Sequence, residues 1–206
     1  LYTVFGYILK FGDDVPHFPI YLLLGVVLWG FFVEATMQGL SAIVGRADLI
    51  RKINFPKYII VISGTLSALI NLIFSMIVVF IFMQFDHVDI RPTIWLFPLI
   101  IIELYVLALA VAFFLSALFV KYRDVGHIWE VILQAAIYAT PIIYPMSFVL
   151  KKSVFAASVM MLNPMAQIVQ DARYVLITPR TTTLYDLVKS PLYVAIPFVL
   201  VIVAVV

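Results

Sequence analysis

The sequence predicts an all-α integral membrane protein that crosses the bilayer several times. Among its 206 residues, 65% are hydrophobic and only 12% are charged, and the mean hydropathy is +1.16. Soluble domains carry about 25% charged residues, roughly twice as many. Apolar runs of about twenty residues recur along the chain, and this is the length that an α-helix needs to cross the hydrocarbon layer. We therefore expect residues 1–206 to form a single transmembrane domain.

The remaining composition excludes several classes of function. The net charge is +2, and the basic residues cluster at predicted membrane edges instead of forming one face, so we expect no nucleic-acid partner. Cysteine is absent, which excludes disulfides and thiolate metal sites. The sequence has neither a GxxxxGK[ST] nor a GxGxxG loop, and its three histidines are scattered over loops. We expect no catalytic residue, metal or cofactor in this chain.

Apolar runs separated by polar breaks define the expected helices. In chain order the spans are residues 1–10 (the end of a first helix), 20–44, 58–83, 94–120, 128–140 and 191–206. Residues 11–19 and 84–93 form connecting loops, and the stretch 178–189 is polar. Apolar sequence continues to both ends, which we interpret as an internal piece of a longer protein with incomplete first and last spans.

Cations in the short loops predict the orientation. The loop after the second span holds Arg46, Arg51, Lys52 and Lys57, and the loop after the fourth holds Lys121 and Arg123. The alternate loops are rich in aspartate, with Arg91 as their cation between spans. Short cytoplasmic loops carry the excess of Lys and Arg, so both basic loops are predicted to be cytoplasmic. The pair Lys151–Lys152 departs from this trend.

The first basic loop, residues 45–58, has an apolar component as well. Leu49, Ile50, Ile53 and Phe55 alternate with its charges, which is typical of a short amphipathic helix on a membrane surface. Pro56 is expected to end that helix. A flank that only fixes topology needs no apolar face, so the pattern favours docking of a soluble partner.

Prolines interrupt the chain after the fifth span. Pro141 and Pro145 are four residues apart and are expected to stop or kink the helix. Asn163 followed by Pro164 predicts a new helix, with Asn as N-cap and Pro at the first position. This helix mixes apolar residues with glutamines, Asp171 and Arg173. We expect short interfacial or re-entrant helices here.

Four sequence marks follow one another along the chain: LIRKINFPK at 49–57, KYRDV at 121–125, TPIIYP at 140–145 and LNP at 162–164, with Arg173 downstream. Together they resemble the ABC-2 type permeases, in the branch that exports O-antigen, capsule and teichoic-acid polymers. The resemblance implies the type V-like ABC-2 exporter fold, with six transmembrane helices, a cytoplasmic coupling helix and short helices on the outer side. It also implies a homodimer in the bacterial cytoplasmic membrane that binds two ATPase subunits, which carry the ATP and Mg²⁺.

The resemblance assigns roles to three groups of residues. The coupling segment for the ATPase comprises Arg46, Leu49, Ile50, Arg51, Lys52, Ile53, Phe55, Pro56 and Lys57; the second cytoplasmic loop comprises Lys121, Tyr122, Arg123 and Asp124; the outer-side motif comprises Pro141, Pro145, Asn163, Pro164 and Arg173.

Aromatic and acidic side chains within the spans are further candidates. Six aromatic residues are candidates to line a path for sugars, although most membrane aromatics pack between helices or at the interface: Trp29, Phe31, Phe32, Tyr105, Tyr138 and Tyr144. Glu34 and Glu103 lie inside spans, where a charge costs about 2.5–3.5 kcal/mol. They are either functional or held by hydrogen bonds within the bundle or across a dimer. We expect Glu130 to pair with Lys121 or Arg123.

The predicted function is a passive permease subunit that exports a lipid-linked polysaccharide, with ATP hydrolysed by its partner. One alternative is an ABC-2 permease for a drug or small lipid, which needs only a closed apolar pocket. The other is a membrane-embedded transferase or scaffold. A transferase needs carboxylates or histidines clustered at one membrane face, and the sequence shows none.

Overall fold

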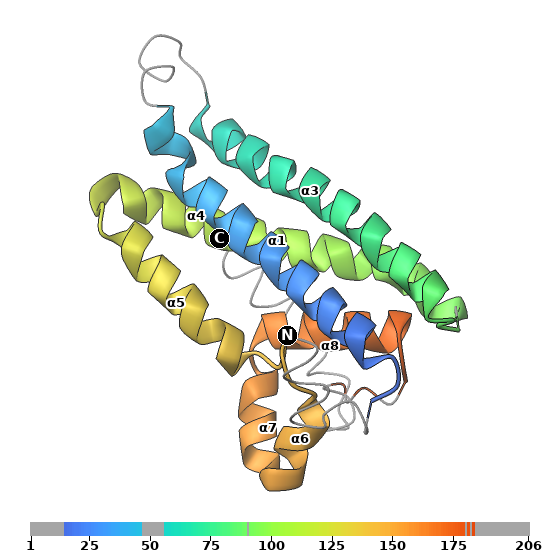
Figure 1. Cartoon of the computed structure of the whole chain (residues 1–206). Helices are drawn as coiled ribbons and strands as arrows, with labels where there is room; N and C mark the ends of the chain where they lie inside the picture. The colour runs from blue at the N-terminus through green and yellow to red at the C-terminus, as the bar shows by residue number, and fades with distance from the viewer. Residues whose placement is uncertain (1–14, 47–55, 90, 180, 182, 184–206) are drawn as a thin grey trace.

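A long apolar helix, α1 (Phe18–Gly45), runs through the middle of the bundle in the computed structural model (Figure 1). The structure describes residues 15–46, 56–89, 91–179, 181 and 183. Helix α3 (Lys57–Phe85) and helix α4 (Phe97–Lys121) pack against α1, and a short 3₁₀ helix, η2 (Pro92–Leu96), leads into α4. Within these ranges no residue forms a β-strand. Three of the helices in these ranges are long and apolar enough to cross a membrane, which confirms the predicted all-α membrane class.

Helix α1 is central because it is apolar on nearly all sides. Leu24, Leu28 and Ala35 are fully buried. At Gly39 the helix approaches α4 so closely that an added Cβ would collide with the side chain of Ala112. Small residues at such crossings are the usual way for membrane helices to approach each other. Helix α3 instead exposes large apolar side chains such as Phe74, as a lipid-facing helix does.

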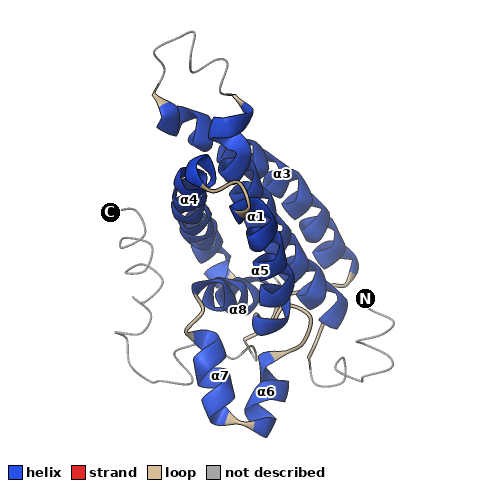
Figure 2. Ribbon diagram, turned by 90° about the vertical axis from the view of Figure 1, so that its left-hand side faces the viewer, coloured by secondary structure: helices blue, strands red, loops and turns tan. Residues whose placement is uncertain are grey.

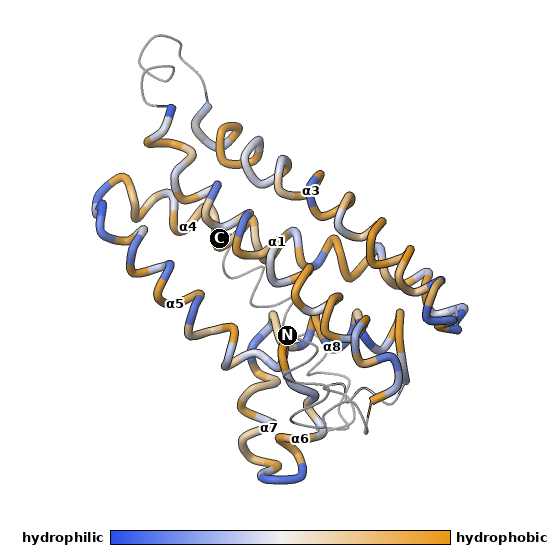
Figure 3. The backbone as a smooth tube through the Cα atoms, in the orientation of Figure 1, coloured by the Kyte–Doolittle hydropathy of each residue, from blue (hydrophilic) through white to orange (hydrophobic). Residues whose placement is uncertain are grey.

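A different set of helix ends meets at each end of the bundle. The end of α1, the start of α3 and the α4–α5 junction lie together at one end, with hydrophilic residues at the helix ends (Figure 3). At the opposite end the Nδ1 atom of His17 lies 2.8 Å from Oδ2 of Asp86 and joins the start of α1 to the end of α3. Both basic loops therefore leave the bundle at the same end, as the cation count predicts.

Helix α5 (Val125–Ala139) returns from the basic end and stops just before the proline segment. Its 15 residues span about 22 Å, less than the roughly 30 Å of hydrocarbon. Three short helices follow: α6 (Met146–Lys152), α7 (Val154–Met161) and α8 (Pro164–Leu176). Helices α6 and α7 form a hairpin at the end of the molecule that is opposite the basic loops (Figure 2).

The predicted start of α8 is confirmed. The Oδ1 atom of Asn163 accepts a hydrogen bond of 3.0 Å from the backbone N–H of Met165, and Pro164 occupies the first helical turn. The Nδ2 group of Asn163 donates to Oγ1 of Thr140 at 3.0 Å. The cap of α8 is thus tied directly to the residue at which α5 ends.

The expected pairing of Glu130 is wrong. Its Oε2 lies 3.7 Å from Nδ1 of His127, one helical turn earlier. Among the described residues, Lys121 and Arg123 form no salt bridge with it. Lys121 instead lies over the ring of Tyr122 and Arg123 over the ring of Phe119. The two cations therefore contact aromatic faces, and the carboxylate of Glu130 contacts a histidine of its own helix.

Several expectations lie outside the described residues. They are the spans over 1–10 and 191–206 and the centre of the first basic loop, with Leu49, Ile50, Arg51, Lys52, Ile53 and Phe55.

Candidate functional site

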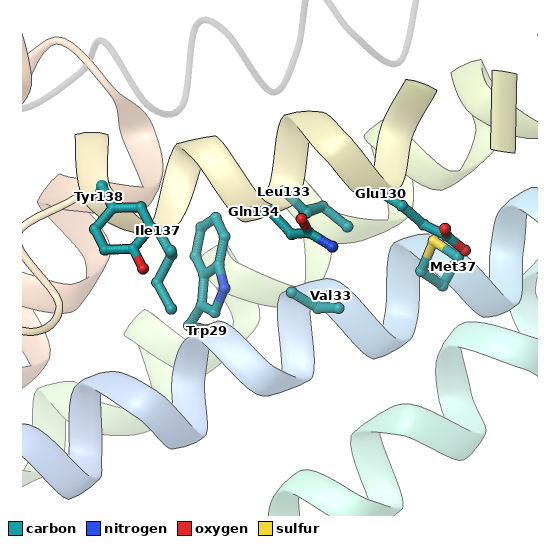
Figure 4. A pocket seen from close by; sticks show the side chains of 8 residues that line it. All are labelled: Trp29, Val33, Met37, Glu130, Leu133, Gln134, Ile137 and Tyr138. Carbon is teal, nitrogen blue, oxygen red and sulfur yellow. The ribbon is translucent and has the colours of Figure 1, made fainter. Parts of the chain in front are cut away.

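An open groove of about 590 Å³ lies between α1 and α5 (Figure 4). Helix α1 contributes Trp29, Val33 and Met37 to its wall, and α5 contributes the facing residues: Glu130, Leu133, Gln134, Ile137 and Tyr138. The wall is mainly apolar, and its polar groups include the amide of Gln134, the carboxylate of Glu130 and the hydroxyl of Tyr138. A groove of this kind offers flat aromatic faces together with hydrogen-bonding groups.

The groove continues toward the basic loops. A second hollow of about 430 Å³ shares Met37 and Glu130 with the first and extends to Arg123 and His127 at the start of α5. Together they form one channel-like surface, which we call the α1–α5 groove. It runs from the basic end of the bundle to Tyr138 near the proline segment.

Aromatic contacts hold α5 beside α1. The indole N–H of Trp129 donates to Oγ1 of Thr36 at 3.1 Å. The ring of Trp129 meets Phe32 edge-on, with centroids 6.5 Å apart, and Phe32 contacts Trp29 at 5.7 Å. This cluster fixes the position of the groove wall in which Trp29 lies.

The structure separates the six aromatic candidates. Tyr138 lines the α1–α5 groove and is exposed, and Trp29 borders the groove although it is only 7% exposed. Phe31 and Phe32 are buried in the core and do not line the groove. The hydroxyl of Tyr105 lies 3.3 Å from Oγ1 of Thr65, between α4 and α3. Tyr144 donates to the backbone carbonyl of Tyr138 at 2.7 Å. Of the six aromatic candidates, Trp29 and Tyr138 are therefore the two that line the groove.

The two carboxylates inside spans have different surroundings. Oε1 of Glu34 accepts hydrogen bonds from Asn71 at 2.6 Å and from Gln38 at 2.9 Å, which joins α1 to α3. Glu103 is buried on α4 and lies near enough to Asp171 of α8 for the two charges to repel each other. Burial raises the pKa of Asp171 to about 6. The sequence did not single out Asp171, because helical periodicity does not show which helix it will face.

Arg173 is fully buried and joins three parts of the chain. Its Nε donates to the carbonyl of Tyr21 at 3.1 Å, and its Nη1 and Nη2 donate to the carbonyls of Pro141 and Ile142 at 2.6 and 2.7 Å. The guanidinium also lies 3.7 Å from the ring centroid of Tyr21. It therefore satisfies carbonyls that the broken helix leaves without amide donors. We call this contact set the Arg173 anchor.

The Arg173 anchor brings together most of the predicted outer-side motif. Pro141 supplies a carbonyl, and Asn163 and Pro164 begin the helix that carries the arginine. The sequence did not single out Tyr21 and Gly25, the α1 residues on which the guanidinium rests. They are one helical turn apart, but nothing in the sequence marks them as its partners.

Replacement of Gly25 by alanine tests this close approach. A Cβ at Gly25 would collide with Nη2 of Arg173, so we expect Gly25→Ala to displace the guanidinium and lower the midpoint of thermal unfolding. Gly30→Ala on the same helix is the matched control, since a Cβ there has nothing within 4 Å. Because alanine favours the helix more than glycine, the control should be neutral or slightly stabilising. Equal midpoints for the two variants would contradict the assignment.

The residues of the basic loops lie at the other end. Arg46 and Pro56 border the first loop and are exposed, and Lys57 begins α3. Lys121, Tyr122, Arg123 and Asp124 are all exposed at the junction of α4 and α5.

These features define the class of the protein: a multi-span helical membrane protein with an open groove between two of its helices. The sequence model for the ABC-2 type transporter matches residues 1–177. The chain belongs to the ABC-2 type transporter family.

Curated relatives agree with this family. The chain is 31% identical over 160 residues to the O-antigen export system permease protein RfbA of Myxococcus xanthus, covering 76% of this chain and 60% of the relative. It is 23% identical over 170 residues to the O-antigen export system permease protein RfbA of Klebsiella pneumoniae, covering 82% and 63%. The chain thus spans about three fifths of the length of these relatives.

Proposed function

We propose that this chain is the membrane subunit of an ATP-driven exporter that moves a lipid-linked polysaccharide across the bacterial cytoplasmic membrane. Its relatives in Myxococcus and Klebsiella are named as O-antigen export permeases. The proposed assembly holds two copies of the chain, each with six spans, and two ATPase subunits that bind ATP and Mg²⁺. The chain itself contributes the path and no catalytic residue.

The α1–α5 groove is the observation that carries this proposal. It extends from the basic end of the bundle to the proline segment, and one side of it is open. A second copy facing this side would close it into a path. Trp29 and Tyr138 would stack on the C–H faces of sugar rings, and Gln134 and Glu130 would exchange hydrogen bonds with sugar hydroxyls. Such contacts suit a polysaccharide, because each contact with a sugar is weak and the same contact can form with each successive sugar of the polymer.

The two basic loops are the proposed contact with the ATPase. They leave the bundle at the same end, next to the start of the groove. An amphipathic helix in the first loop would dock its apolar side into a cleft of the ATPase, and its cations would fix the register. Movement of that helix would pass directly to α1 and α3, which it connects.

Replacement of Tyr138 by alanine tests the path. The side chain is 68% exposed and lines the groove, so its removal leaves the helix packing unchanged. We expect polymer at the cell surface to fall roughly three- to tenfold, the equivalent of one aromatic contact. Co-purification of the ATPase should be unchanged. Trp29→Ala should also reduce export, and because Trp29 is only 7% exposed and packs on Phe32, part of its effect will come from lost packing.

Trp95→Ala is the control, since Trp95 is 85% exposed on η2 and lies outside the groove. Normal polymer export in both Tyr138→Ala and Trp29→Ala would show that the polymer does not pass along the groove. If the groove variants still move the lipid carrier across the membrane but lose polymer at the cell surface, the groove is a path for polymer, because a short lipid does not need the aromatic wall. Equal loss of both would favour an exporter of small lipids.

A further inference from the structure

Another hollow, of about 290 Å³, lies between α1 and α3 at the end of the bundle from which the basic loops leave (Figure 1). Three of its lining residues are glycine or alanine, which leaves the space open. Four lining residues are polar: Gln38, Ser41, Arg46 and Ser67. Gln38 and Ser41 also border the α1–α5 groove on the other side of α1, whereas Arg46 and Ser67 do not.

The polar wall of this hollow offers hydrogen-bond acceptors. The hydroxyls of Ser41 and Ser67 donate to carbonyls one turn earlier in their own helices, at 3.2 and 3.1 Å. The Nε2 group of Gln38 donates to Oε1 of Glu34 at 2.9 Å. A hydroxyl whose hydrogen is used in this way keeps its lone pairs, and the oxygen of an amide only accepts. A ligand of this hollow must therefore bring donors of its own.

The two ends of the hollow carry opposite charges. Arg46 lies exposed at the outer end, directly after the last turn of α1. Glu34 lies beyond the inner end, one helical turn before Gln38, and its carboxylate also accepts a hydrogen bond of 2.6 Å from Asn71 of α3. A ligand with a phosphate at one end and an ammonium at the other matches this order of charges.

We propose that this hollow binds the headgroup of a phospholipid with a primary ammonium, of the phosphatidylethanolamine kind, in the leaflet next to the basic loops. Arg46 contacts the phosphate, and the ammonium donates to Ser41, Ser67 and Gln38. Leu66 and Ile70 are exposed beside Ser67, and the acyl chains lie along them. This apolar surface favours a lipid over a free phosphate ester. The inference does not depend on the exported substrate.

Phosphatidylcholine provides the contrast that isolates the ammonium. It carries the same phosphate, but its trimethylated nitrogen has no N–H group and leaves the acceptors of the hollow without donors. The loss of one hydrogen bond from a charged group weakens binding about tenfold. We therefore expect phosphatidylethanolamine to associate with the hollow about tenfold more strongly than phosphatidylcholine.

Site-specific quenching measures this preference. The 206 residues contain no cysteine, so Leu66→Cys gives a single attachment point for an apolar fluorophore beside the hollow. The protein is reconstituted in phosphatidylglycerol bilayers that contain either brominated phosphatidylethanolamine or brominated phosphatidylcholine. Ser67→Leu removes an acceptor and adds an apolar side chain, so the tenfold ratio should fall to about one. Ser63→Leu is the matched control and should keep the ratio, because Ser63 is also exposed on α3 but does not line the hollow.

Arg46→Gln separates the phosphate contact from the ammonium contact. Both lipids carry the phosphate, so both should associate more weakly while their ratio stays near ten. A label at Phe74→Cys controls for position: Phe74 is 64% exposed further along α3 and lies outside the hollow, so the ratio there should be about one.

A ratio of about one at position 66, or the same preference at positions 66 and 74, would overturn the proposal. So would a label at position 66 that neither lipid quenches, and disulfide cross-linking through Leu66→Cys would then show that a second copy of the chain covers this hollow.

Discussion

Arg173→Met should strongly lower the stability of the folded protein. The variant keeps an unbranched, apolar side chain but removes all three hydrogen bonds, so the buried carbonyls of Pro141 and Ile142 lose their donors. Each orphaned buried carbonyl costs about 1–3 kcal/mol. Loss of the contact with the Tyr21 ring adds to this. We expect the free energy of unfolding to fall by several kcal/mol in total. The measurements are a lower unfolding midpoint in detergent and faster proteolysis between α5 and α6.

Arg123→Met is the control for this experiment. Arg123 is also an arginine beside an aromatic ring, but it is exposed and donates to no buried carbonyl in the described structure. An exposed substitution of this kind usually changes stability by less than about 0.5 kcal/mol. If Arg173→Met unfolds at the same temperature as Arg123→Met, the Arg173 anchor is not what holds α8 in place.

Ile53→Asp should abolish association with the ATPase. Ile53 is four residues from Leu49, so the two share one side of the expected amphipathic helix in the first basic loop. A charge placed at an apolar anchor must be buried without a partner, which costs about 3 kcal/mol or more and weakens binding about a hundredfold or more. The measurement is co-purification of the ATPase together with polymer at the cell surface.

Lys52→Gln is the neighbouring control. It removes one charge at the rim of the expected contact, and rim charges mainly affect association rates in a salt-dependent way. Membrane insertion should survive in both variants, because the other cations of the loop remain. If Ile53→Asp binds the ATPase and exports polymer as the wild type does, the loop only fixes the membrane topology and does not dock on the ATPase.

The long helices were predictable because hydrophobic length alone determines them. The expected spans 20–44 and 58–83 differ from α1 and α3 by no more than two residues at either end. Asn163 and Pro164 identified the start of α8 equally well, since a cap is a local feature of the sequence. Each of these predictions depends on residues that are close together in the chain.

Partners between distant helices were not predictable. The sequence identified Arg173 as part of a motif but did not indicate that its guanidinium reaches the carbonyls at the α5 break and the ring of Tyr21. The aromatic candidates show the same limit: periodicity cannot separate Tyr138, which is exposed in the groove, from Phe31, which lies in the core. The pairing of Glu130 was predicted from proximity in sequence and was wrong: Lys121 and Arg123 lie over the rings of Tyr122 and Phe119, and Glu130 lies beside His127.

The burial of α8 has a consequence for the order in which the protein assembles during synthesis. Its 13 residues extend over about 20 Å, too short to cross the bilayer. It also carries two glutamines, an aspartate and an arginine, and such a segment would not leave the translocon for lipid on its own. The carbonyls and the aromatic ring that receive Arg173 exist only once α1 and the end of α5 are in place. Helix α8 must therefore join a bundle that is already inserted, as one of the last steps of biogenesis.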